Sequence, residues 1–205
     1  TKLDTLSNNG DEVCFCTIGD ASTSEGHFWE TVNAASVLQV PLAIFIWDDG
    51  YGISVPRKYQ TAKGSISEAL KGFQKKDDSN GLMIYKVKAW DYAGMCEAFE
   101  DGIRKARDKH IPVLFHVEEV TQPQGHSTSG SHERYKTPER LEWERNWDCL
   151  RKMREWVIEN MLSGRIDVSA WITNRASPEE LTEQFASWLL PETGVIKAML
   201  TFEPA

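Results

Sequence analysis

The stretch GDASTSEGHFWETVNAASVLQVPLAIFIWDDGYGIS, residues 19–54, decides the fold. It places Asp20 directly after one apolar run and the pair Asp48–Asp49 directly after the next run. Both runs are continuous rather than alternating in apolar residues, a pattern that is typical of buried strands. Carboxylates at the ends of two buried strands are costly unless a positive group binds them, because a desolvated charge must be paired or coordinated. The stretch therefore predicts a cation site where two strands end.

Runs with the length and the β-branched or aromatic content of strands alternate with segments of helical spacing. The predicted strands cover residues 13–18, 42–47, 83–90 and 113–120, and the predicted helices cover residues 24–39, 64–76 and 91–110. The first helix is expected to have Ser24 or Thr23 as its N-cap. Strands that alternate with helices pair in parallel through right-handed crossovers. We therefore predict an α/β fold with an open, mainly parallel sheet and helices on both of its faces.

The pattern changes after Val120. Residues 121–137, TQPQGHSTSGSHERYKT, offer almost nothing to a core and predict a long polar loop, and loops of this length are usually functional or disordered. A long helix is predicted from Pro138, and a further helix is predicted near residues 178–190. We therefore divide the chain into an α/β domain over residues 1–137 and a C-terminal helical extension over residues 138–205, which packs onto the domain or onto a partner subunit.

Composition limits the classes of partner. The 205-residue chain carries 23 Lys and Arg residues against 31 Asp and Glu residues, a net charge of −8. The basic residues are scattered, so we expect no nucleic-acid partner. No apolar segment approaches the roughly 20 residues that cross a bilayer, and the first residues lack the pattern of a signal peptide. We expect no membrane association and a cytoplasmic location. Because the chain begins without Met and reaches its first strand almost at once, we expect it to be part of a longer protein.

The acidic strand ends also predict the kind of ligand. In an open parallel sheet, ligands bind outside the carboxyl ends of the strands. Asp20 is followed by small polar residues that allow close approach, and by a helix start that suits a phosphate. Asp49 lies at the same end of the next strand, and two carboxylates would repel a phosphate unless a divalent cation lay between them. Mg²⁺ takes about six oxygen ligands, commonly carboxylates and phosphates. The pattern predicts a magnesium diphosphate site.

The full order of features is more specific than any single motif. A strand, Gly-Asp, a small polar loop, a helix, a second strand, an acidic residue and Gly-Tyr follow one another. This order resembles the thiamine diphosphate enzymes, and among them the α component (E1) of 2-oxo acid dehydrogenases, from about Val13 to Tyr135. The matches SEG at 24–26, GYGIS at 50–54 and HSTS at 126–129 lean towards the branched-chain (2-oxoisovalerate) members.

The resemblance implies a set of site residues. It makes the carboxylates of Asp20 and Asp49 and the carbonyl of Tyr51 ligands of Mg²⁺. His126 matches a histidine that faces the diphosphate and the substrate entrance, and is the implied catalytic residue. The backbone N–H groups of Ala21 and Ser22 would approach the diphosphate, and Ile53 and Ser54 would lie near the middle of the cofactor. The implied cofactor-binding residues are Gly19, Asp20, Ala21, Ser22, Asp49, Tyr51, Ile53, Ser54 and His126.

Several positions depart from the family pattern. Ala21 replaces a second glycine, and Asp49 stands where asparagine is usual, which adds a negative charge. Trp47 and Gln122 occupy places where relatives often carry an arginine that faces the diphosphate. The basic residues that could substitute are Arg57, Lys58 and Arg134. Ser127 and Ser129 match serines that are phosphorylated in some relatives, and by default they only shape the loop.

The resemblance implies a function for a larger assembly. The reaction would be the oxidative decarboxylation of a (branched-chain) 2-oxo acid, with acyl transfer to a lipoyl-bearing E2 protein. The implied partners are a pyrimidine-binding, β-type E1 domain or subunit and further copies of the chain in a homo-oligomer, so the isolated chain is expected to be inactive. Two alternatives stay open. The first is another thiamine diphosphate enzyme, transketolase-like or acetoin-cleaving, and the second is a non-catalytic α/β domain that binds only a metal.

Overall fold

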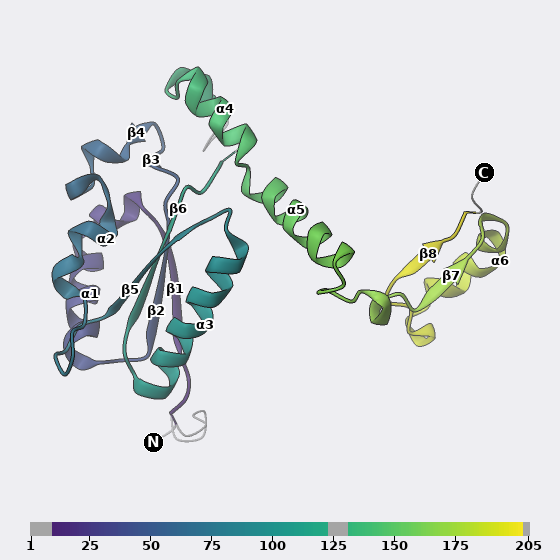
Figure 1. Cartoon of the computed structure of the whole chain (residues 1–205), viewed down its shortest axis with the longest axis horizontal. Coiled ribbons are helices and arrows are strands. Elements are labelled where there is room, and N and C mark those ends of the chain that lie inside the picture. The colour runs from purple at the N-terminus through teal and green to yellow at the C-terminus, as the bar shows by residue number, and fades with distance from the viewer. Residues whose placement is uncertain (1–9, 123–130, 203–205) are drawn as a thin grey trace. The chain divides into compact units, whose positions relative to one another are not determined.

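The computed structural model describes residues 10–122 and 131–202 (Figure 1). The chain forms two compact units, Thr1–Met153 and Arg154–Ala205. Their boundary falls within helix α5 (Cys149–Leu162), whereas the sequence places a boundary at residue 137. Helix α4 (Pro138–Asn146) therefore belongs to the same unit as the sheet.

The first unit is built on a four-stranded parallel sheet. Its order is β1 (Cys14–Gly19), β2 (Leu42–Trp47), β6 (Val113–Glu118) and β5 (Met83–Lys88). Gly19 pairs with Trp47, and Trp47 pairs with Val117, so three strands end at one edge of the sheet. The predicted α/β class with a mainly parallel sheet is confirmed, and the residues that follow β1 and β2 meet at this carboxyl edge.

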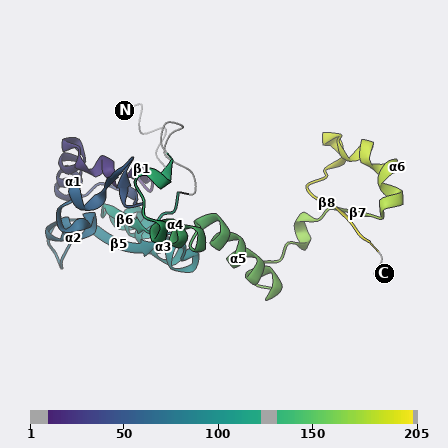
Figure 2. The ribbon, with the colours of Figure 1, turned by 90° about the horizontal axis from the view of Figure 1, so that it is seen from above.

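Helices cover both faces of the sheet. Helices α1 (Gly26–Leu38) and α2 (Ile66–Ala69) lie side by side over one face, and α3 (Tyr92–Lys109) covers the other (Figures 1 and 2). Alternate residues of β2 enter the two cores, because side chains point to opposite faces of a strand in turn. Ile44 and Ile46 pack with α1 and α2, and Ala43 and Phe45 pack with α3.

Strand β1 differs from the expectation that both strands of the opening stretch are buried. It lies at the edge of the sheet, and its side chains are mostly exposed, with Phe15 at 54%. Strand β2 has neighbours on both sides and is buried over residues 43–46. The prediction of burial was wrong for β1 because an apolar run does not reveal a strand's place in the sheet order.

Three predicted helices change their limits. Residues 21–24 form a 3-10 turn, η1 (Ala21–Ser24), whose Thr23 hydroxyl donates to the carbonyl of Asp20 at 2.6 Å, so α1 begins only at Gly26. The helix predicted over 64–76 is reduced to α2 and the 3-10 turn η4 (Lys71–Phe73). The long helix predicted from Pro138 is broken between α4 and α5, because the carboxylate of Asp148 accepts the N–H of Arg151 at 2.9 Å and starts a new helix.

Short elements complete the two units. The first unit also contains the antiparallel pair β3 (Tyr51–Gly52) and β4 (Val55–Pro56), and the 3-10 turns η2 (Arg57–Tyr59), η3 (Ala62–Gly64) and η5 (His132–Arg134). The second unit contains η6 (Ser169–Trp171), β7 (Asn174–Ala176), α6 (Pro178–Trp188), η7 (Pro191–Thr193) and β8 (Ala198–Leu200). Helix α6 confirms the helix predicted near 178–190, whereas the parallel pair of β7 and β8 is not predicted from the sequence.

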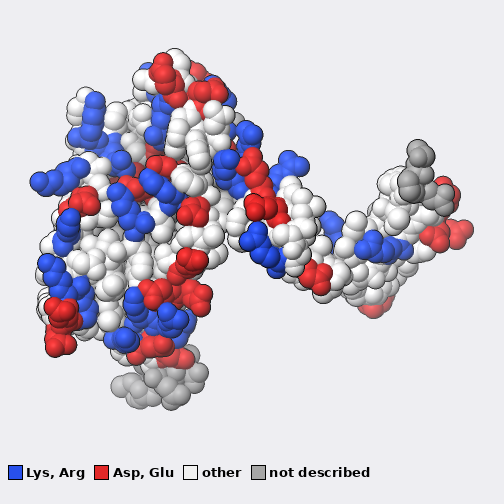
Figure 3. Space-filling model, viewed as in Figure 1, with Lys and Arg blue, Asp and Glu red and all other residues white. Residues whose placement is uncertain are grey.

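Surface charge and helix length can be compared with the expectation of no nucleic-acid and no membrane partner. On the face drawn in Figure 3, Lys and Arg side chains are mixed with Asp and Glu side chains over each unit. Among the described residues, no helix is both long enough and apolar enough to cross a membrane.

Gly102 of α3 provides a test of how closely this helix packs on the sheet. A Cβ atom at this position would lie 2.5 Å from Cζ of Phe115 and 3.0 Å from Cε2 of Tyr85. We therefore predict that Gly102→Ala lowers the free energy of unfolding by about 1–3 kcal/mol through overpacking. Urea unfolding followed by circular dichroism would measure this loss.

Gly72 offers a matched control, because an added Cβ there meets no heavy atom within 4 Å. Gly72→Ala should change the free energy of unfolding by no more than about 0.5 kcal/mol. Equal effects of the two substitutions would contradict the close packing of α3.

Candidate functional site

Asp20 is the most unusual side chain at the carboxyl edge. It follows β1, is 3% exposed, and its N–H donates to the carbonyl of Trp47 at 3.2 Å. Its Oδ2 atom is buried and has no hydrogen-bond partner among the described residues. Burial, followed by the negative charges of Asp48 and Asp49, raises the pKa of Asp20 to about 7. The side chain therefore lacks the positive partner that a buried carboxylate requires.

A cavity of about 670 Å³ opens at this edge of the sheet. Its lining residues are Gly19, Asp20, Ala21, Ser22, Trp47, Asp49, Tyr51, Gly52, Ile53, Gln60, Val120, Thr121 and Gln122. The structure thus brings together all the predicted site residues except Ser54, which is exposed and outside this lining, and His126. His126, Ser127 and Ser129 lie outside the described residues.

The loop that follows β2 is held in an uncommon conformation. The carboxylate of Asp49 accepts the N–H of Tyr51 at 3.0 Å, and Ile53 has a φ of 59°. A positive φ is rare for a β-branched residue and costs on the order of 1–3 kcal/mol. The side chain of Ile53 is 60% exposed beside the cavity. The loop therefore offers an apolar surface to a ligand at the expense of backbone strain.

Asp48, the neighbour of Asp49, has protein partners of its own. Its Oδ1 accepts the N–H of Gly50 at 2.8 Å, and its Oδ2 lies 2.8 Å from Nε2 of His116 and forms an ion pair with Arg57. Although burial opposes ionisation, the hydrogen bond from His116 and the charge of Arg57 hold the pKa of Asp48 below its usual value. The negative charge of Asp48 is therefore balanced by protein partners, whereas, among the described residues, that of Asp20 is not.

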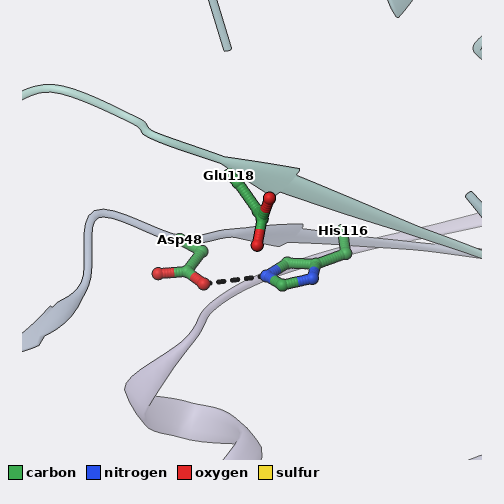
Figure 4. A group of neighbouring side chains, drawn as sticks. All are labelled: Asp48, His116 and Glu118. Carbon is green, nitrogen blue, oxygen red and sulfur yellow. Dashed lines mark hydrogen bonds and ion pairs between the residues drawn. The ribbon is translucent and has the colours of Figure 1, made fainter. Parts of the chain in front are cut away.

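Asp48, His116 and Glu118 form a buried group of metal-binding residue types (Figure 4). Their ligand-type atoms lie within 4.8 Å of one another. Glu118, however, pairs with Lys86 at 3.1 Å and with Lys88 at 3.3 Å, and Asp48 pairs with Arg57. Protein cations already neutralise both carboxylates, so a metal ion is less needed here than at Asp20. We regard this group as an internal ion-pair cluster.

Asp49 has cations nearby that the sequence does not reveal. Its backbone carbonyl accepts a hydrogen bond from Nη2 of Arg140 at 2.9 Å. Burial raises the pKa of the Asp49 carboxyl, while the N–H of Tyr51 and the charge of Lys136 partly oppose this rise. Lys136 and Arg140 were assigned to the polar loop and to the helical extension, and no local pattern links them to Asp49.

The basic residues named from the sequence, Arg57, Lys58 and Arg134, do not line the cavity. Arg57 is bound to Asp48, and Lys58 is exposed with its Nζ 4.8 Å from the ring of Tyr59. Arg134 is exposed and does not line the cavity. Within the described part of the chain, the lining of the cavity contains Asp20 and Asp49 but no lysine, arginine or histidine. The described lining of the cavity is therefore acidic.

A parallel α/β sheet with a cavity at its carboxyl edge is the arrangement in which open α/β proteins bind ligands. Residues 5–177 match the family described as Dehydrogenase E1 component, and the chain belongs to this family. The family predicted from the Gly-Asp and Gly-Tyr motifs is thereby confirmed.

Relatives of two named types resemble the chain to a similar degree. The pyruvate dehydrogenase E1 component subunit alpha of Rickettsia prowazekii is 26% identical over 165 residues, which cover 80% of this chain and 47% of that protein. The mitochondrial 2-oxoisovalerate dehydrogenase subunit alpha of Homo sapiens is 25% identical over 179 residues, which cover 86% of this chain and 38% of that protein. The chain spans half or less of the length of these relatives.

The raised pKa of Asp20 predicts how stability depends on pH in the absence of metal. Because the pKa rises from 3.8 to about 7 on folding, the contribution of Asp20 to the free energy of unfolding falls as pH increases through this interval. Asp20→Asn cannot ionise and should raise the Tm at about pH 8, and this gain should disappear towards about pH 4. Thermal unfolding in a chelating buffer across this range would measure the difference.

Asp78→Asn is a suitable control, because Asp78 is exposed and distant in sequence from the carboxyl edge. It should leave the difference in Tm from wild type near zero at every pH. A gain for Asp20→Asn that is the same at high and low pH would contradict the proposed ionisation.

Proposed function

We propose that this chain is the diphosphate-binding part of the E1 component of a 2-oxo acid dehydrogenase, with thiamine diphosphate and Mg²⁺ as its cofactors. The observation that carries this proposal is the buried Oδ2 of Asp20, which has no hydrogen-bond partner among the described residues. Asp20 also lines the cavity of about 670 Å³. A bound cation would account for a buried carboxylate oxygen without a partner. Membership of the dehydrogenase E1 component family supports the same cofactors.

The residues around the cavity fit a hard divalent cation. Mg²⁺ prefers oxygen ligands, and we assign this role to the carboxylates of Asp20 and Asp49 and to the carbonyl of Tyr51. Since no cationic side chain lines the described part of the cavity, its two carboxylates would repel a diphosphate on its own. Binding of the diphosphate therefore requires the metal.

The remaining residues are assigned by their place in the cavity or in the sequence. Gly19, Ala21 and Ser22 would face the diphosphate, because small residues let a ligand approach the backbone closely. Ile53 and Ser54 would lie near the middle of the cofactor. When bound, thiamine diphosphate supplies the electron sink for decarboxylation of a 2-oxo acid. His126 would donate a proton or orient the substrate.

The reaction of the whole assembly would be the oxidative decarboxylation of a branched-chain 2-oxo acid, with acyl transfer to a lipoyl-bearing E2 protein. The motifs GYGIS at 50–54 and HSTS at 126–129 favour this substrate class. The assembly would lie in the cytoplasm and contain a pyrimidine-binding, β-type E1 domain or subunit, with homo-oligomeric contacts. The chain alone would be inactive. A panel of 2-oxo acids, acetoin and ketose phosphates, tested on the complete assembly, would separate this reaction from those of other thiamine diphosphate enzymes.

Calorimetric titration tests the metal-bridged site directly. Thiamine diphosphate should bind the chain in the presence of Mg²⁺, and its affinity should fall at least about tenfold when Mg²⁺ is removed or when Asp20 is changed to Asn. The reason is that the two carboxylates repel the diphosphate when its cation is absent, and a tenfold loss corresponds to about 1.4 kcal/mol. The exposed variant Asp78→Asn should bind as the wild type does.

Two outcomes would count against the proposal. Equal affinity for the cofactor with and without Mg²⁺ would contradict a metal bridge. Binding of Mg²⁺ that is unaffected by thiamine diphosphate would instead favour a non-catalytic, metal-binding α/β domain.

A further inference from the structure

A buried ion-pair triad lies against the loop that carries Asp49 and Tyr51. Lys136 precedes α4, and its side chain is 1% exposed. Its Nζ donates to both carboxylate oxygens of Glu144, at 2.8 Å and 2.9 Å. Arg140, one turn before Glu144 in α4, donates from Nε to Oε1 of the same carboxylate at 2.8 Å. One buried carboxylate thus holds two cations in fixed positions.

Both cations also contact the Asp49–Tyr51 segment. Nη2 of Arg140 donates to the carbonyl oxygen of Asp49 at 2.9 Å. The ring of Tyr51 lies 5.1 Å from Nζ of Lys136 and 5.6 Å from the guanidinium carbon of Arg140, within the range of cation–π attraction. Neither cation lines the cavity of about 670 Å³. They would therefore act on a ligand through Asp49 and Tyr51.

The cations of this cluster partly offset the negative charge of the carboxylate at position 49. Two cations, Lys136 and Arg140, surround one anion, Glu144, so the triad carries an excess of one positive charge. Asp49 supplies one negative charge beside it. Asp48, the adjacent carboxylate, has its own partners in Arg57 and His116. The positive charge of Lys136 acts on Asp49, whereas Arg140 also helps to lower the pKa of Glu119.

The geometry points to Lys136 and Arg140 as positioning residues for the candidate metal ligand Asp49. Lys136 offsets the negative charge that Asp49 adds to the site, and Arg140 fixes the backbone of Asp49 through its carbonyl. This inference rests on the proposed function for the identity of the ligand. The charge offset itself is a property of the metal-free chain and can be tested without any cofactor.

A double-mutant cycle on the metal-free chain tests the charge offset. Lys136→Gln should lower Tm in the wild-type background by at least about 2 °C more than in the Asp49→Asn background. The loss of the Lys136–Glu144 pair is common to both backgrounds and cancels in the cycle. Lys136→Arg keeps the positive charge and should restore the wild-type coupling to Asp49. Equal losses of Tm in the two backgrounds would overturn the role of Lys136.

Cofactor binding tests the role of Arg140. With Mg²⁺ present, Arg140→Gln should weaken binding of thiamine diphosphate at least about fivefold, since Asp49 loses the donor that fixes its carbonyl. Arg145 is a matched control on the same helix, because it pairs with Glu142 at the exposed surface. Arg145→Gln should change the affinity less than about twofold. Equal effects of the two arginine variants would overturn the role of Arg140.

The two readouts also separate this inference from the proposed function. If the wild-type chain binds no thiamine diphosphate, the proposed function is contradicted, and the Tm cycle still decides whether Lys136 and Asp49 are coupled. If the wild-type chain binds and Asp49→Asn loses Mg²⁺-dependent binding, the assignment of position 49 as a metal ligand that asparagine can replace is contradicted.

Discussion

The cost of burying carboxylates at one edge of a sheet governs the structure around the cavity. Parallel strands bring Asp20, Asp48 and Asp49 to the same edge, where their charges disfavour one another. In the described part of the chain, the three carboxylates differ in their positive partners. Asp48 is neutralised by Arg57 and His116, and Asp49 lies beside the cations of the triad. Asp20 receives no cation from the described residues, so its uncompensated charge lies at the cavity, where a ligand can compensate it.

Much of the fold follows from local patterns. Strands β2, β5 and β6 and helix α3 were predicted close to their observed limits, since continuous apolar runs and helical spacing specify them without knowledge of distant residues. The meeting of Asp20 and Asp49 was predictable as well, because parallel strands that alternate with helices end at one edge. The exposure of β1 was not predictable in this way. Its apolar composition matches that of β2, and only the order of strands distinguishes an edge from a centre.

Site residues near the two strand ends could be predicted from the sequence, whereas those from distant segments could not. The residues that line the cavity come mainly from the two strand ends and their loops, which the Gly-Asp and Gly-Tyr motifs mark. Lys136 and Arg140 lie about ninety positions from Asp49 along the chain, and neither stands in a recognisable motif. Arg57 was named from the sequence as a residue that could face the diphosphate, and in the structure it pairs with Asp48. The sequence therefore indicated candidate basic residues from their charge, but it could not show which carboxylate each one pairs with.

The backbone of the loop from Asp48 to Ile53 is fixed at many points. The carboxylates of Asp48 and Asp49 accept the N–H groups of Gly50 and Tyr51, and the carbonyl of Gly50 accepts the N–H of Arg57 at 2.8 Å. These bonds constrain the loop in which Ile53 has its left-handed conformation. Such preorganisation lowers the conformational entropy that is lost on binding, at the cost of some folding stability. The strained loop thus lowers the folding stability of the free chain and reduces the entropy that is lost when a ligand binds.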